Sequence, residues 1–213
     1  MSDVPRRVPV IGLVGGVGCG KSHLARLLHE KYPIEIVEGD NAGHQVLTDP
    51  RVKESLREAF GEVVFASTGE VNRTQISRLV FGSEPQQQAA RKKLEQIVHP
   101  RISEILARQV ALARSRPDVE AVILDAAILL EAGWRHICDA VVFIDTPLEK
   151  RLERVTKSRG WSRDELRLRE ESQFPLERKR KEADHVVDNS GDVQVALSQL
   201  DTVYSRVLGP NHS

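Results

Sequence analysis

The chain contains the stretch Gly15-Gly16-Val17-Gly18-Cys19-Gly20-Lys21-Ser22, which satisfies the pattern G-x-x-x-x-G-K-[ST]. An apolar run typical of a β-strand, residues 8–14, precedes it, and a helix-like segment, residues 22–29, follows it. This order of strand, loop and helix is the context that the pattern requires. Glycines let successive backbone N–H groups turn toward one point, and the helix N-terminus adds partial positive charge there. The stretch therefore predicts a binding site for phosphate groups.

The phosphates that such a loop binds are those of a nucleoside triphosphate. We expect the backbone of the loop to contact this triphosphate, through Gly16, Val17, Gly18, Cys19 and Gly20. Lys21 would reach the β- and γ-phosphates, and the Ser22 hydroxyl would ligate Mg²⁺. The alternative, a glycine-rich turn without a ligand, is disfavoured because every position of the pattern is filled in the right context.

Length and composition narrow the class of protein. The 213 residues suffice for one α/β domain with a complete core, or for one domain with an insertion. Lys plus Arg and Asp plus Glu both total 31, so no global charge favours nucleic acid or an anionic membrane as a partner. The two cysteines exclude a disulfide framework, and no signal-peptide pattern or membrane-length apolar stretch is present. We expect a soluble, cytoplasmic protein.

Five segments predict the strands of a sheet. Residues 121–125 and 140–145 are near-continuous β-branched or aliphatic runs, typical of strands buried on both faces of a parallel sheet. Residues 8–14, 34–37 and 185–188 predict the others. Helical patterns fill the intervals, so the sequence predicts an α/β fold of the P-loop NTPase type, with a doubly wound parallel sheet of about five strands.

One interval is too long for a simple crossover between strands. It carries four helical patterns, at residues 51–60, 74–81, 86–98 and 101–114, with apolar residues at helical spacing. Ligands of α/β proteins gather at the carboxyl ends of the strands, so these helices would form the wall on the acceptor side of the site. We therefore predict a helical insertion that binds the molecule to which the phosphoryl group is transferred, the acceptor.

A basic segment follows the fourth predicted strand. Residues 150–182 contain twelve Lys or Arg and seven Asp or Glu. Small-substrate kinases close arginine-bearing lids over ATP, which predicts a lid here, although a solvated helix face paired with nearby glutamates remains the favoured alternative for any single arginine. We predict one kinase domain, residues 1–213, in three parts: a core (8–46, 118–149 and 184–208), a helical insertion (47–117) and a lid (150–183).

Two carboxylates are candidates for the chemistry. Asp125 ends an apolar strand, where it could ligate Mg²⁺ or its waters, or cap the following turn. Asp40 follows the second strand and could accept the proton of an attacking hydroxyl. It could also act as the N-cap of the next helix, and these two roles can coexist. His99 is a lone histidine, which favours a structural role on the residues alone.

Taken together, these residues resemble the dephospho-CoA kinase family, whose members phosphorylate the 3′-hydroxyl of the ribose in the last step of coenzyme A synthesis. The similarity covers most of the chain in order. Besides the phosphate loop it includes Gly39-Asp40, Phe60-Gly61, Gly69-Glu70-Val71-Asn72-Arg73, Val80-Phe81, Ile97-Val98-His99-Pro100-Arg101-Ile102, Leu129-Leu130-Glu131-Ala132-Gly133, Asp139, Arg154, Gln173 and Ala183-Asp184-His185-Val186-Val187-Asp188-Asn189-Ser190-Gly191.

The resemblance implies a role for each candidate residue. It implies Asp40 as general base on the acceptor, Lys21 as phosphate clamp and Arg154 as a catalytic lid arginine. It places Arg159 and Asn189 at the nucleotide, and His99, Pro100, Arg101, Leu129 and Glu131 at the CoA moiety. The implied substrates are ATP and dephospho-CoA, with Mg²⁺, in a monomer or small homo-oligomer without nucleic-acid or membrane partners. Another P-loop kinase, acting on a nucleoside monophosphate or a metabolite, is the alternative.

The sequence also departs from the family pattern at several positions. Glu38 and Gly39 replace the Asp-Ala that usually precedes the catalytic aspartate, and Cys19 and His23 replace a Ser and a Thr around the loop. The second lid arginine, Arg159, lies one position later than is common. None of these changes removes a charged group that phosphoryl transfer requires.

Overall fold

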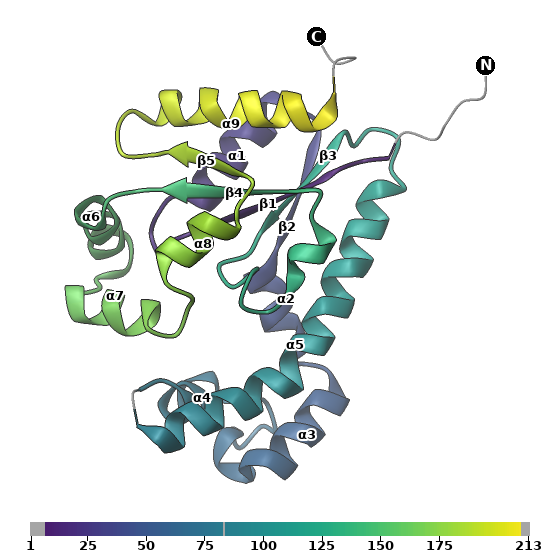
Figure 1. Cartoon of the computed structure of the whole chain (residues 1–213). Coiled ribbons are helices and arrows are strands. Elements are labelled where there is room, and N and C mark those ends of the chain that lie inside the picture. Colours follow the sequence, from purple (N-terminus) through teal and green to yellow (C-terminus); the bar gives the residue numbers. More distant parts are fainter. Residues whose placement is uncertain (1–6, 83, 210–213) are drawn as a thin grey trace. The chain divides into compact units, whose positions relative to one another are not determined.

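The computed structural model describes residues 7–82 and 84–209 (Figure 1). The chain divides into two compact units, one made of the residues up to Glu38 and from Ala107 onward, the other of residues Gly39–Leu106. Among the helices of the described ranges, none is both long and apolar enough to cross a lipid bilayer. The phosphate loop belongs to the first unit, which contains the sheet.

The sheet of the first unit has five parallel strands in the order β2-β3-β1-β4-β5 (Figure 1). The strands are β1 (Val10–Gly15), β2 (Ile34–Glu38), β3 (Ala121–Asp125), β4 (Ala140–Asp145) and β5 (His185–Asp188). The central strand is β1, whose Leu13 lies opposite Asp125 on one side and Val142 on the other. The predicted α/β fold with a five-stranded parallel sheet is confirmed.

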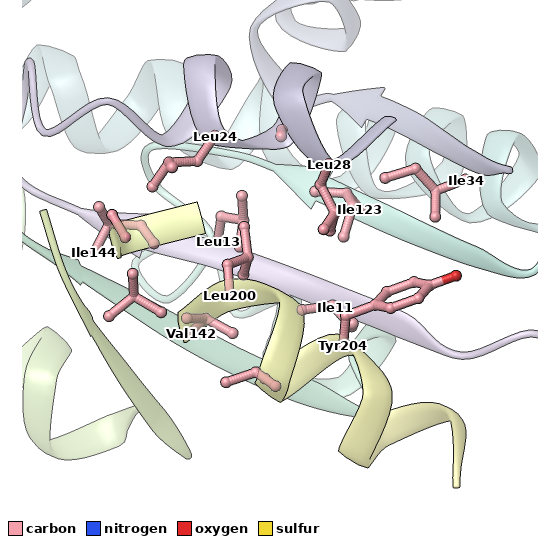
Figure 2. Packing of buried hydrophobic residues seen from close by; sticks show 14 of the residues in the cluster. Ile11, Leu13, Leu24, Leu28, Ile34, Ile123, Val142, Ile144, Leu200 and Tyr204 are labelled. Atoms are coloured by element: carbon pink, nitrogen blue, oxygen red, sulfur yellow. The ribbon is translucent and has the colours of Figure 1, made fainter. Parts of the chain in front are cut away.

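The core of the first unit lies between the sheet and two helices, α1 (Lys21–Lys31) and α9 (Val193–Leu208). Alternate strand residues point into it, as the period of two along a strand requires. Figure 2 shows Leu24 and Leu28 of α1 and Leu200 of α9 packed around Leu13 of the central strand. At one end of this layer the rings of Tyr32 and Tyr204 stack with their centroids 4.4 Å apart.

Other elements follow or pack against the sheet. Helix α8 (Leu176–Glu182) packs against β1 and β4, and a short 3₁₀ helix, η2 (Trp134–Ile137), precedes β4. Helix α6 (Leu148–Arg159) begins two residues before the predicted lid, and α7 (Arg163–Glu170) lies within it. A capping box between Ser162 and Glu165 starts α7.

The second unit is helical. Its elements are α2 (Gly39–Val46), α3 (Pro50–Phe60), η1 (Glu62–Val64), α4 (Arg73–Val80) and the first part of α5 (Pro85–Arg114). The side chain of Asp49 caps α3 by accepting from Arg51 N at 2.8 Å, and Asn72 caps α4 in the same way. Leu56, Val64 and Ile76 are buried. The helices predicted at residues 51–60 and 74–81 are present as α3 and α4.

Helix α5 corrects one prediction. The sequence analysis expects two helices, 86–98 and 101–114, separated at His99-Pro100, whereas the structure has one helix of 30 residues with Pro100 inside it. Proline removes one N–H donor, so the carbonyl of Gln96 loses its partner, but every other turn can still form. Ile102, Leu106 and Val110 continue the helical spacing and are buried. Packing of these side chains therefore outweighs the local cost of the proline.

The cost of Pro100 can be measured. We expect Pro100→Ala to raise the free energy of unfolding by about 1–3 kcal/mol, because alanine restores a backbone donor inside a helix. Pro85→Ala is the matched control, since Pro85 is the first residue of the same helix, where proline is tolerated. Urea unfolding of both variants gives the comparison. Equal or lower stability of Pro100→Ala relative to the control would contradict the explanation.

Candidate active site

The phosphate loop connects the central strand to the first helix. It begins at Gly15, the last residue of β1, and ends at Gly20, after which Lys21 starts α1. Gly18 and Gly20 have φ angles of +77° and +94°, which favour glycine. A Cβ atom at Gly18 would lie 2.7 Å from Val155 Cγ1, and one at Gly20 would lie 2.7 Å from Asn189 Nδ2. Glycine is therefore required both by the backbone and by the neighbours of the loop.

The carbonyl of Cys19 holds the second half of the loop in place. It accepts hydrogen bonds from Thr146 Oγ1 at 3.0 Å, Arg154 Nη1 at 2.9 Å and Asn189 Nδ2 at 2.8 Å. Thr146 follows β4, Asn189 follows β5, and Arg154 lies in α6. Because the oxygen points at protein donors, it does not point at a bound phosphate. The Cys19 side chain is fully buried, so only its backbone can take part in phosphate binding.

Within the described residues, the backbone N–H groups of Gly18 and Gly20 have no hydrogen-bond partner in the protein. The N–H of Cys19, in contrast, donates to Gly16 O at 3.1 Å. The Lys21 side chain is largely buried, with Nζ 3.7 Å from Cys19 Sγ, and Ser22 is exposed. The loop thus presents open donors and a lysine at the N-terminus of a helix, which suits an anion of several oxygens.

The Asp125 carboxylate lies at the same edge of the sheet. Asp125 ends β3 and lies opposite Leu13 of β1 and Glu38 of β2. It is partly exposed, and no residue of the described ranges hydrogen-bonds to its carboxylate. The described residues hold no group of three or more His, Cys, Asp or Glu that could bind a metal alone. One carboxylate and the Ser22 hydroxyl fit Mg²⁺, which keeps several waters and takes oxygens from substrate phosphates.

The two predicted lid arginines have different surroundings. Arg154 of α6 contacts the loop through Cys19 O and reaches Asn189 O at 3.5 Å. Arg159, at the end of the same helix, lies over the ring of Trp161 with its guanidinium carbon 4.6 Å from the ring centroid. Arg169 of α7 also stacks on this ring, at 3.7 Å. The structure therefore brings Arg154 to the phosphate loop and holds Arg159 on an aromatic ring.

The segment after β3 contains two residues predicted to contact the acceptor. Leu129 is fully buried, and a Cβ atom at Gly12 of β1 would lie 2.7 Å from its Cδ1. Glu131 forms an ion pair with Lys179 of α8 at 2.7 Å, and the lysine side chain has no exposed surface. Lys179 Nζ also donates to Ala127 O at 2.9 Å and Gln173 Oε1 at 2.8 Å, so all three of its donors are used. Burial lowers the pKa of Lys179, and Glu131 opposes that shift.

The remaining candidates belong to the second unit. Asp40 is exposed in the first turn of α2, which begins at Gly39, so Asp40 is not the N-cap that the alternative reading expects. His99 is half-buried in α5, and Pro100 beside it is exposed. Burial lowers the pKa of the His99 imidazole, with the Glu95 carboxylate opposing the shift. Arg101 pairs with Glu104 at 2.7 Å.

Four further residues of the site were not predicted from the sequence. Thr146 and Lys179 are described above, and Arg151 and Glu170 contact the first half of the loop. Arg151 Nη1 donates to Val17 O at 3.4 Å, and Glu170 Oε1 accepts from Val17 N at 3.1 Å. The only sequence signal for Arg151 is its place in the basic segment, three residues before Arg154.

The family model and the similar proteins of known sequence agree on one family. The sequence model of the family described as dephospho-CoA kinase matches residues 9–194. A dephospho-CoA kinase from Bacillus licheniformis is 33% identical over 93% of this chain and 98% of that protein. One from Deinococcus radiodurans is 37% identical, over 92% and 90%.

Solved structures agree with the fold. The structure of TT1252 from Thermus thermophilus has a TM-score of 0.77 and 31% identity, and the match covers 95% of this chain and all (100%) of that chain. A dephospho-CoA kinase from Campylobacter jejuni has a TM-score of 0.58 at 20% identity, covering 93% of this chain and 97% of the other. At that identity the likeness shows the fold alone.

The buried ion pair between Glu131 and Lys179 predicts a large effect on stability. Glu131→Ala leaves the lysine charge buried without its counterion, and we expect a loss of about 3–5 kcal/mol in the free energy of unfolding. Glu182→Ala is the control, because its pair with Arg178 on the same helix is exposed and should contribute less than about 1 kcal/mol. Chemical unfolding measures both. Similar losses in the two variants would contradict a special role for the buried pair.

The lowered pKa of His99 predicts a pH effect. Above the ordinary value of 6.5 the imidazole is neutral in both states. As the pH falls below that value the unfolded state takes up a proton first, so the fold loses stability until the folded pKa is passed. We expect His99→Gln to lose less stability than the wild type between pH 7.5 and 5.5 in urea unfolding. His44→Gln, an exposed histidine of the same unit, is the control, and equal losses in His99→Gln and the wild type would refute this.

Proposed function

The chain belongs to the dephospho-CoA kinase family, and we propose that it transfers the γ-phosphoryl group of ATP to the 3′-hydroxyl of the ribose of dephospho-CoA. The product is coenzyme A, and the reaction is the last step of its synthesis. The observation that carries this proposal is the complete phosphate loop at the carboxyl end of the central strand. A loop of this kind, in a chain that matches the family over residues 9–194, is the donor half of a kinase site.

On the donor side, the chain's own groups bind and orient the triphosphate. The open N–H groups of the loop donate hydrogen bonds to phosphate oxygens, and Lys21 clamps the β- and γ-phosphates. Arg154 adds positive charge beside the loop, with Asn189 and Arg159 as further nucleotide contacts. Phosphoryl transfer depends mostly on positioning and on stabilisation of charge, so Lys21 and Arg154 contribute as much as any proton acceptor.

We propose Ser22 and Asp125 as the residues that hold Mg²⁺. They supply the hydroxyl and carboxylate oxygens that this hard cation prefers, at the edge of the sheet where the loop lies. Bound there, Mg²⁺ would neutralise charge on the phosphate oxygens.

On the acceptor side, Asp40 is the proposed general base. It follows Glu38, the last residue of β2, by two positions, and its carboxylate would accept the proton of the 3′-hydroxyl. His99, Pro100, Arg101, Leu129 and Glu131 are the proposed contacts to the CoA moiety. In this scheme the predicted insertion, residues 47–117, binds the acceptor, and the predicted lid, residues 150–183, covers ATP.

The remaining expectations concern the cellular location, the partners and the oligomeric state of the enzyme. We infer a cytoplasmic location, because both cysteines are free and buried, as suits a reducing compartment. ATP and dephospho-CoA are the proposed partners, and a monomer or small homo-oligomer remains the prediction for the assembly.

A coupled assay that follows ADP release tests the activity. We expect turnover with ATP and dephospho-CoA and the appearance of coenzyme A. Nucleoside monophosphates and small hydroxylated metabolites form the comparison panel. Turnover with a member of this panel, and none with dephospho-CoA, would favour the alternative kinase.

Asp40→Asn tests the proposed base. We expect kcat to fall roughly 10²–10⁴-fold, the range for a positioned general base, while the Kd for ATP stays within about twofold. Glu58→Gln is the control, because it removes an exposed carboxylate from the same unit. Steady-state kinetics and nucleotide titration provide the numbers. A wild-type kcat in Asp40→Asn would exclude Asp40 as the base.

A further inference from the structure

The first half of the phosphate loop is held by a pair of charged side chains outside the proposed machinery. The carbonyl of Cys19 fixes the second half, whereas Gly16 and Val17 meet Arg151 of α6 and Glu170 of α7. We propose that Arg151 and Glu170 are positioning residues that shape the loop for nucleotide and so set its affinity for ATP. This inference rests on the proposed function in one respect, that the loop binds ATP.

Arg151 is placed to hold the backbone from inside the protein. Its side chain is only 5% exposed. Nε donates to Thr146 O at 3.0 Å and Nη1 donates to Val17 O at 3.4 Å. The guanidinium also lies directly against Gly16, where a Cβ atom would come within 2.8 Å of Nη1. Arg151 therefore links the end of β4 to the first half of the loop.

Glu170 completes the arrangement from α7, of which it is the last residue. Its Oε1 accepts from Val17 N at 3.1 Å and from Arg151 Nη1, with which it forms an ion pair. Both polar groups of Val17 are thus bound, the carbonyl by Arg151 and the N–H by Glu170. The next donors along the loop, Gly18 N and Gly20 N, have no partner within the described ranges. Fixing Val17 limits the directions in which these donors can point.

A carboxylate at a phosphate loop could instead compete with the nucleotide. Two features favour positioning. The charge of Glu170 is matched by Arg151, so the pair as a whole does not add net negative charge beside the loop. The N–H that Glu170 occupies is that of Val17, whereas two other N–H groups of the loop are open. The two roles predict opposite signs: loss of the carboxylate weakens ATP binding if Glu170 positions the loop, and tightens it if Glu170 competes.

The test compares Glu170→Ala, Glu170→Gln and Glu171→Ala in the full chain. Glu171 is the matched control, since it is the neighbouring glutamate, is exposed and pairs only with Arg167, at 3.6 Å, in the described structure. The Kd of a fluorescent ATP analogue is measured without acceptor, together with kcat and KM for both substrates. We expect Glu170→Ala to raise the Kd and the KM for ATP about tenfold, the effect of losing a hydrogen bond to a charged group.

The other readouts separate positioning from a general loss of structure. Glu170→Gln keeps an acceptor oxygen for Val17 N and Arg151, so its Kd should stay within about threefold of the wild type. In Glu170→Ala, kcat at saturating ATP and KM for dephospho-CoA should change less than about twofold, because the pair acts on nucleotide binding only. Glu171→Ala should match the wild type. A Kd for Glu170→Ala that is unchanged or lower than in the wild type would overturn the inference.

Glu170→Ala leaves a buried guanidinium without its counterion, so it could fail to fold. The double variant Arg151→Met/Glu170→Leu then serves, because apolar side chains of similar size remove the buried charges together with both contacts to Val17. We expect it to fold and to raise the Kd about tenfold or more; wild-type affinity would overturn the inference. A wild-type protein that binds ATP without phosphorylating dephospho-CoA would refute the proposed acceptor alone.

Discussion

The carbonyl of Cys19 is the point on which the site depends. Three donors reach it from three places in the chain: Thr146 after β4, Arg154 in α6 and Asn189 after β5. Parallel strands end at one edge of the sheet, so the register of β4 against β1, and of β5 against β4, decides whether these donors meet the loop. The loop conformation is therefore a property of the whole sheet, and glycine content alone does not produce it.

The glycines of the loop satisfy protein packing as well as ligand binding. Side chains at Gly18 or Gly20 would meet Val155 or Asn189 at 2.7 Å, apart from any nucleotide. Gly12, inside the strand, shows the same constraint, because Leu129 and Cys138 pack directly on it. Burial raises the pKa of Cys138 to about 12, so its thiol stays neutral and acts as a small apolar group. The glycines of the phosphate-binding pattern are thus also required by the close packing of strand, loop and helix.

Local patterns were sufficient for the fold and for the donor loop. Residues 121–125 and 140–145 were predicted as strands with the bounds that the structure gives, because buried parallel strands are continuous apolar runs. The bounds of the edge strand, 185–188, were also correct, although only Val187 in it is buried. The break expected at Pro100 was wrong, since burial of the next helical turns outweighs a local penalty.

Arg151 and Glu170 could not be found from local patterns. Glu170 contacts Val17, which lies 153 positions earlier in the chain. In a run of charged residues, the local sequence does not show which side chains are buried and which are solvated. The solvated-face reading holds for Arg167, which pairs with Glu171, and fails for Arg151 and Arg154. The roles of Asp40, His99 and Arg101 remain predictions.

In the basic segment, residues 150–182, some cations are paired with carboxylates and others, within the described ranges, are not. The pairing decides which of these side chains keep a positive charge that could act on a triphosphate. Arg151 is matched by Glu170, Lys179 by Glu131 and Arg163 by Glu149, so these cations add little field at the loop. Arg154 differs, because its hydrogen bonds go to the neutral carbonyls of Cys19 and Asn189, and no carboxylate pairs with it in residues 7–82 and 84–209. A cation held by neutral acceptors keeps its full charge while its position is fixed, which is the condition for stabilising charge on a transferring phosphoryl group without reorganisation. The net excess of the segment is therefore less informative than the identity of each partner. We therefore propose Lys21, Arg154 and the dipole of α1 as the main sources of positive charge beside the loop.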